Sequence, residues 1–100
     1  MPKGKMATQV AHASVDAVLK SDKMIIDLWQ NEGSKKAVLK VNDKKELGQY
    51  INLAKKNNVI SSVIKDAAKT FFKIPQVTCM AIGPDKEEKI DRITGDLSLI

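Results

Sequence analysis

The chain has 100 residues, 43% of them hydrophobic, so it is predicted to form a single domain over residues 1–100 with one small core. Its formal net charge of +5 favours a polyanion as partner, although many small proteins with no nucleic-acid role are equally basic. The chain has a single cysteine, Cys79, so it cannot form an intramolecular disulfide. Because it also has only one histidine, we expect neither a metal site nor a cofactor. The sequence shows neither a membrane-span pattern nor a signal-peptide pattern, so we expect a cytoplasmic protein.

The first half of the chain predicts two helices and a strand. A helix is expected over residues 4–20, and Ser21-Asp22 offers an N-cap for a second helix over residues 23–31. Gly33 is placed to end that second helix. The segment KAVLKV, residues 36–41, is rich in branched side chains and predicts a short strand.

The second half predicts two helices that alternate with two strands. Asn42 or Asp43 caps a helix over residues 44–57, with Glu46 in the position of a capping-box partner. Strands are expected over residues 59–65 and 77–82, and the second is apolar on both faces and therefore predicted to be central. An acidic segment predicts a last helix over residues 85–93, followed by an apolar tail or edge strand at 97–100. The alternation indicates an α/β layer structure.

A polar stripe follows the first predicted helix. Lys5, Gln9, His12 and Asp16 succeed one another at steps of four, three and four residues, which places them within one narrow wedge of a helix turning about 100° per residue. Their neighbours are Met, Ala and Val, and such surroundings seldom carry four polar groups without a use. The periodicity alone is equally that of an ordinary solvated stripe.

Three segments, in this order, give the stripe a context: GKMATQVAHAS from Gly4, DAAKT from Asp66 and QVTCMAIGP from Gln76. Together they resemble the archaeal and eukaryotic (type 2) peptidyl-tRNA hydrolase family, which carries GKGKxxxQxxHA, DAG-x-T-Q and a Thr leading to GIGP. The closing segment KIDRITGDLSLI is also similar to that family. The matching residues are Lys3, Gly4, Lys5, Gln9, His12, Ala13, Asp66, Ala67, Thr70, Thr78, Ile82, Gly83 and Pro84.

The resemblance implies a fold and an activity. The fold would be a three-layer α/β/α sandwich around a small mixed β-sheet. The protein would be an enzyme that hydrolyses the ester between peptide and tRNA, so that peptidyl-tRNA is the partner. The alternative is a non-enzymatic tRNA- or protein-binding module on the same fold, with a decayed site.

The resemblance also implies roles for five candidate catalytic residues. Asp66 would orient or deprotonate water, although an Asp after a strand is often only a turn residue. Lys5 would hold a phosphate or stabilise developing negative charge, or pair with Asp66. Gln9 would hydrogen-bond the peptide carbonyl or the ribose, and the hydroxyls of Thr70 and Thr78 would position water or substrate.

Three further residues are candidate substrate contacts. Lys3 and Lys69 would contact phosphates, although each alone is indistinguishable from a solvated lysine. His12 is a tempting general base, but between two alanines we expect it to be partly buried, with its ring hydrogen-bonded inside the fold.

The sequence departs from the family pattern in three places. The family's first inner strand precedes the GKGK motif and is missing here; without it an apolar strand edge would be exposed, from which we expect a homodimer or a longer natural N-terminus. Ala68 replaces the glycine of DAG, and Phe71 replaces an amide. The loop FFKIP, which begins at Phe71, lies beside the proposed site. This loop and the missing strand favour the non-enzymatic alternative, whereas the complete polar set favours the hydrolase.

Overall fold

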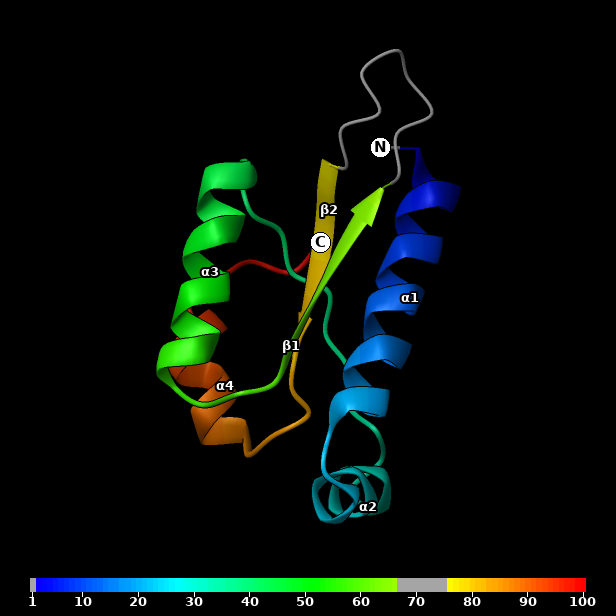
Figure 1. Cartoon of the computed structure of the whole chain (residues 1–100), viewed down its shortest axis with the longest axis vertical. Helices are drawn as coiled ribbons and strands as arrows, with labels where there is room; N and C mark the ends of the chain where they lie inside the picture. The colour runs from blue at the N-terminus through cyan, green and yellow to red at the C-terminus, as the bar shows by residue number, and fades with distance from the viewer. Residues whose placement is uncertain (1, 67–75) are drawn as a thin grey trace.

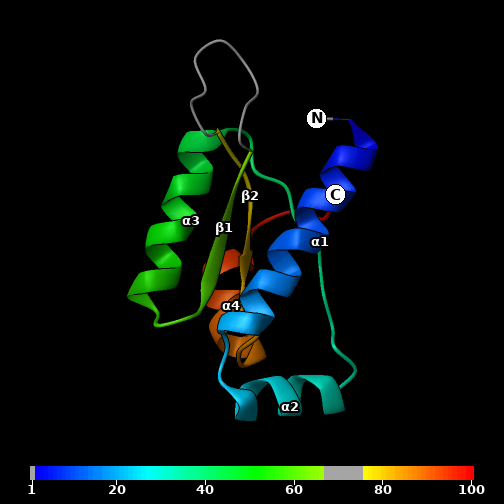
Figure 2. The same ribbon diagram turned by 45° about the vertical axis from the view of Figure 1, so that its right-hand side comes forward.

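A computed structural model of the chain describes residues 2–66 and 76–100. In chain order its elements are α1 (Lys3–Lys20), α2 (Lys23–Asn31), α3 (Lys44–Lys56), β1 (Ser61–Asp66), β2 (Gln76–Ile82) and α4 (Glu87–Thr94). Figure 1 shows β1 and β2 between α1 on one side and α3 with α4 on the other, and Figure 2 shows the same layers from a second direction. The predicted α/β class and its three-layer arrangement are confirmed.

The two strands are antiparallel, and their register defines one end of the molecule. Ser61 lies opposite Ile82 and Asp66 lies opposite Gln76, with an irregularity between Ile64 and Lys65. The end of β1 and the start of β2 are therefore neighbours. The first turn of α1 and the first turn of α3 lie at this same end in both views (Figures 1 and 2). We call it the site end of the molecule.

Small side chains let the helices approach the sheet closely. Ala13 and Ala17 are the buried residues of α1, which packs on both strands. On the other face Ala54 of α3 is fully buried and forms a cluster with Val59 and Ile93. Partly buried apolar side chains pack around that cluster, namely Tyr50, Leu53, Ile82 and Ile90.

The four predicted helices are present with nearly the expected limits. α3 has the predicted cap, because the Asp43 carboxylate accepts a hydrogen bond from the Glu46 N–H at 2.8 Å. α4 begins two residues later than predicted, at Glu87. Asp85 instead lies before the helix, where its carboxylate accepts from the Lys86 N–H at 2.7 Å. In the described residues no helix is both long and apolar enough to cross a bilayer.

The strand predicted over residues 36–41 is wrong. This segment makes one isolated bridge, between Leu39 and Leu99 near the C-terminus. The Lys40 N–H donates to the Ser98 carbonyl at 3.1 Å and the Ile100 N–H donates to the Val38 carbonyl at 3.0 Å. Branched residues favour a strand only when a neighbour pairs along its length, and so short a pairing does not extend a sheet. Within the described residues the sheet therefore has two antiparallel strands rather than a mixed arrangement, and β2 is not central.

Candidate functional site

A chain of hydrogen bonds joins α1 to both strands near the site end. The Gln9 side-chain amide donates to the Thr78 hydroxyl at 3.2 Å, and that hydroxyl donates to the Ile64 carbonyl at 3.3 Å. The Cys79 thiol donates to the backbone carbonyl of Gln9 at 3.4 Å. Because the one hydroxyl proton of Thr78 is used on Ile64, its oxygen accepts from Gln9 and fixes the position of that amide. Two of the predicted catalytic residues, from opposite halves of the sequence, are thus in direct contact.

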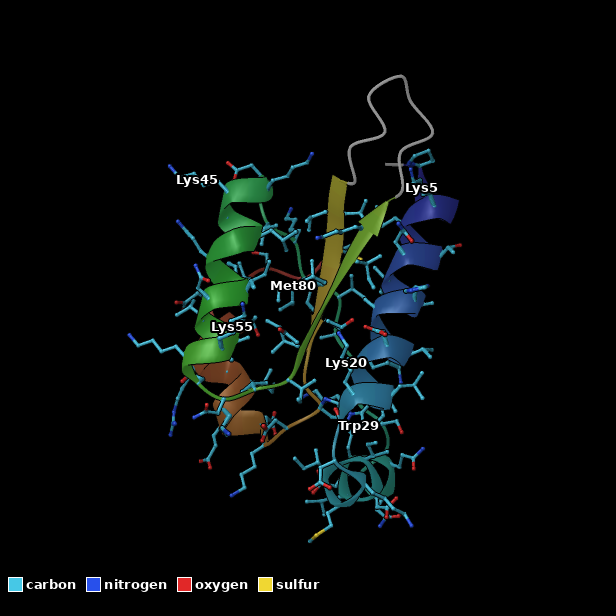
Figure 3. The ribbon with its side chains drawn as sticks, in the orientation of Figure 1. Lys5, Lys20, Trp29, Lys45, Lys55 and Met80 are labelled. Atoms are coloured by element: carbon cyan, nitrogen blue, oxygen red, sulfur yellow. The ribbon has the colours of Figure 1, made fainter. Side chains whose placement is uncertain are left out.

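Lys5 and Lys3 lie in the first turn of α1, at the site end (Figure 3). Both side chains are exposed. That turn contains no acidic residue, and no side chain among the described residues caps it. The positive end of the helix dipole therefore adds to the two ammonium groups, and an anion is favoured at this position.

The other predicted site residues are placed only in part. Asp66 is the last residue of β1, opposite Gln76, so its backbone lies at the site end with Lys5 (Figures 1 and 3). The side chain of Asp66 and the residues Thr70 and Lys69 lie outside the described residues, as do the departures Ala68 and Phe71.

The prediction that His12 is partly buried is wrong. Its side chain is exposed and lines a shallow hollow on the outer side of α1 together with Thr8, Ala11, Val15, Asp16 and Leu19. The flanking alanines were misleading, because Ala13 is buried and Ala11 is exposed. Successive residues of a helix are turned by about 100° from one another. His12, between an exposed and a buried alanine, therefore lies at the edge of the buried face and not within it.

Sequence reasoning missed the partner of Asp16. Ser62 of β1 is fully buried and its hydroxyl donates to the Asp16 carboxylate, while the Lys20 ammonium lies 3.2 Å from the same carboxylate oxygen. The hydrogen bond from Ser62, and then the hydrogen bond from Lys20, lower the pKa of Asp16 below its ordinary value of 3.8. The signal in the sequence was the spacing of seven residues between Gln9 and Asp16, which puts both on the sheet-facing side of one helix.

The described residues offer an amine, an amide and a hydroxyl rather than metal ligands. No three His, Cys, Asp or Glu side chains within residues 2–66 and 76–100 lie close enough together to hold a metal ion. Burial raises the pKa of the Cys79 thiol, which disfavours the thiolate that a nucleophilic cysteine would need. An ammonium and an amide at one end of a sheet suit an anionic or ester substrate.

Comparison with known proteins agrees with this arrangement. Residues 1–100 match the family described as Peptidyl-tRNA hydrolase PTH2. The chain is 48% identical to the peptidyl-tRNA hydrolase of Nanoarchaeum equitans, over 97% of this chain and 87% of the relative. It is 45% identical to that of Methanopyrus kandleri, over 100% of this chain and 88% of the relative, and 48% identical to that of Haloquadratum walsbyi, over 99% and 88%. The chain therefore belongs to the peptidyl-tRNA hydrolase PTH2 family, as its motifs predicted.

Proposed function

We propose that this protein hydrolyses the ester bond between the peptide and the tRNA in peptidyl-tRNA and so releases the tRNA for reuse. The relatives that carry this name match nearly the whole chain. The observation that carries the proposal is the contact between Gln9 and Thr78 at the end of the molecule where Lys5 lies and β1 ends in Asp66.

Each polar group has a distinct task in this reaction. The Lys5 ammonium stabilises the negative charge that develops on the ester carbonyl oxygen, or holds a terminal phosphate. The amide of Gln9, held by Thr78, hydrogen-bonds the peptide carbonyl or the ribose. Asp66 orients the attacking water and Thr70 assists it through its hydroxyl. Lys3, Lys69 and His12 are substrate contacts.

The non-enzymatic alternative is not favoured. The hydrogen bonds from Gln9 to Thr78 and from Thr78 to Ile64 support an organised site, and relatives that match nearly the whole chain are named as hydrolases.

Release of labelled peptide from a peptidyl-tRNA mimic by the purified protein tests the proposal. Lys5→Ala should lower kcat/KM by about 10²–10³-fold, because it removes the charge that stabilises the oxyanion. Lys23→Ala is the matched control, since Lys23 is an exposed lysine at the start of α2, and it should retain wild-type activity. Wild-type protein that releases no peptide, or equal activity in Lys5→Ala and Lys23→Ala, would contradict the assignment.

We also propose that the protein acts as a homodimer, in the cytoplasm where its tRNA substrate is used. Two features support self-association. Within the described residues each strand has a single strand neighbour, so each presents an unpaired edge. The outer side of α1 and α2 carries exposed apolar side chains, among them Leu19 and Met24.

A further inference from the structure

The outward side of α3 is uniformly basic or neutral. Its exposed residues are Lys44, Lys45, Gln49, Asn52, Lys55 and Lys56, which we call the α3 lysine face. Two acids lie at the start of this helix, where Asp43 accepts from the Glu46 N–H at 2.8 Å and the Glu46 carboxylate accepts from the Asn42 N–H at 3.2 Å. Both carboxylates keep their charge, but in the described residues neither forms an ion pair with a lysine of α3.

Three lysines outside α3 form ion pairs within the described residues, unlike those of the α3 lysine face. Among the described residues, Lys20 pairs with Asp16 at 3.2 Å, Lys35 with Glu87 at 3.3 Å and Lys89 with Asp85 at 3.5 Å. None of the ion pairs found in that part of the chain includes a lysine of α3. As far as residues 2–66 and 76–100 show, the face thus carries four positive charges and takes part in no ion pair.

Helix stability does not account for this arrangement. Lys55 and Lys56 lie in the last turn of α3, where the negative end of the helix dipole favours cations. Lys44 and Lys45 lie in the first turn, where the positive end of the dipole disfavours them. The helix dipole therefore does not explain the presence of Lys44 and Lys45 at the start of α3.

The α3 lysine face begins beside the site end and leads away from it. Figure 3 shows Lys45 at the same end of the molecule as Lys5, and Lys55 at the opposite end of α3. With a rise of 1.5 Å per residue, the face extends roughly 16 Å from Lys45 to Lys56. A nucleic-acid duplex carries about one charge per 1.7 Å of axis, so several phosphates can lie along such a row.

We propose that the α3 lysine face binds the sugar–phosphate backbone of the tRNA while the 3′ end of the same tRNA occupies the site. This inference rests on the proposed function, which makes tRNA the substrate. Lysines contact phosphates without reading sequence, and the amides of Gln49 and Asn52 can hydrogen-bond phosphate oxygens or ribose hydroxyls. The face therefore recognises tRNA as a polyanion.

Binding of deacylated tRNA at several KCl concentrations tests the inference without any hydrolysis. Each lost lysine–phosphate contact lowers the slope of log Kd against log salt by about 1, so Lys45→Gln/Lys56→Gln should lower it by about 2. Affinity at about 0.1 M salt should fall by about tenfold or more. The matched control is Lys23→Gln/Lys40→Gln, which removes the same charge from two exposed lysines outside α3 and should keep the wild-type slope.

Kinetics give a second readout that a folding defect cannot imitate. The ratio of kcat/KM for full-length peptidyl-tRNA to that for a peptidyl ester of a short 3′ oligonucleotide should fall in the α3 variant. An unchanged salt slope, or an equal loss on both substrates, would overturn the inference. Failure of the proposed function looks different, because wild-type protein would then release no peptide from either substrate.

Discussion

Two polar side-chain contacts hold α1 on the sheet. Gln9 reaches Thr78 of β2 near the site end, and Asp16 reaches Ser62 of β1 farther along the helix. A buried hydroxyl that found no acceptor would cost free energy, so the Asp16 carboxylate satisfies Ser62 and fixes the position of α1 at the same time. That position also determines where Gln9 meets β2.

The contact between Asp16 and Ser62 predicts a pH dependence of stability. The pKa of Asp16 is lowered in the folded protein, so its contribution is fully present above the ordinary value of 3.8 and is lost as the pH falls through the folded value. Between those two values the free energy of unfolding should rise with pH in the wild type and rise less in Asp16→Asn. Urea unfolding at a series of acidic pH values measures both slopes.

Asp27→Asn is a suitable control, because Asp27 is an exposed residue of α2 and the charge change is the same. Equal slopes for wild type and Asp16→Asn would contradict the role given to this carboxylate. Ser62→Ala should reduce the slope as well, since the hydrogen bond from Ser62 is the larger cause of the lowered pKa.

The sequence predicted the motif residues of the site, but it did not predict every pairing between side chains. Lys5, Gln9 and Thr78 were predicted from motif residues, and the structure brings Gln9 and Thr78 into contact. The exposure of His12 and the pairing of Ser62 were not predicted, because both depend on how α1 is rotated against the sheet. That rotation follows from packing of the small residues of α1, which periodicity does not specify.

At the scale of elements, local signals were sufficient for helices and insufficient for one strand. Caps and helix-ending residues act within a few positions of the chain, so the limits of α2 and α3 could be predicted closely. A strand needs a partner that is distant in the sequence, and residues 36–41 meet theirs only at Leu39. The hydrophobic pattern of residues 36–41 could not show that this segment lacks a neighbouring strand along most of its length.

The N-terminus of α3 gives an element-scale prediction. Asp43→Ala removes the side chain that accepts from the Glu46 N–H, and should lower the free energy of unfolding by about 1 kcal/mol in urea titration. The sequence left Asn42 and Asp43 as alternative caps, so Asn42→Ala is the informative control. Only the backbone N–H of Asn42 takes part in the cap, and its variant should differ from wild type by less than about 0.5 kcal/mol. The reverse order of the two losses would show that the cap is misassigned.

At the scale of the whole molecule, small side chains form the buried core while several larger apolar side chains remain exposed. The buried hydrophobic residues in the described part of the chain are small or branched: Ala13, Ala17, Ala54, Val59, Ile64 and Ile93. Larger apolar side chains remain on the outer side of α1 and α2, where Leu19 is 78% exposed and Met24 79% exposed. The composition predicted a small core, but only the fold shows which of the large apolar residues of α1 and α2 remain exposed.

This surface carries the prediction of a homodimer. Val15 and Leu28 are also more than half exposed, at 59% and 58%, and they flank Leu19 and Met24 on the same two helices. Burial of a leucine side chain contributes about 1.5–3 kcal/mol, so Leu19→Glu should weaken self-association by about tenfold or more in sedimentation equilibrium. Gln30→Glu adds the same charge at an exposed position of α2 and should leave the dimer intact.

A wild-type protein that sediments as a monomer at all concentrations would refute the dimer. A dimer unaffected by Leu19→Glu would place its interface elsewhere, with the unpaired strand edges as the remaining surface for self-association.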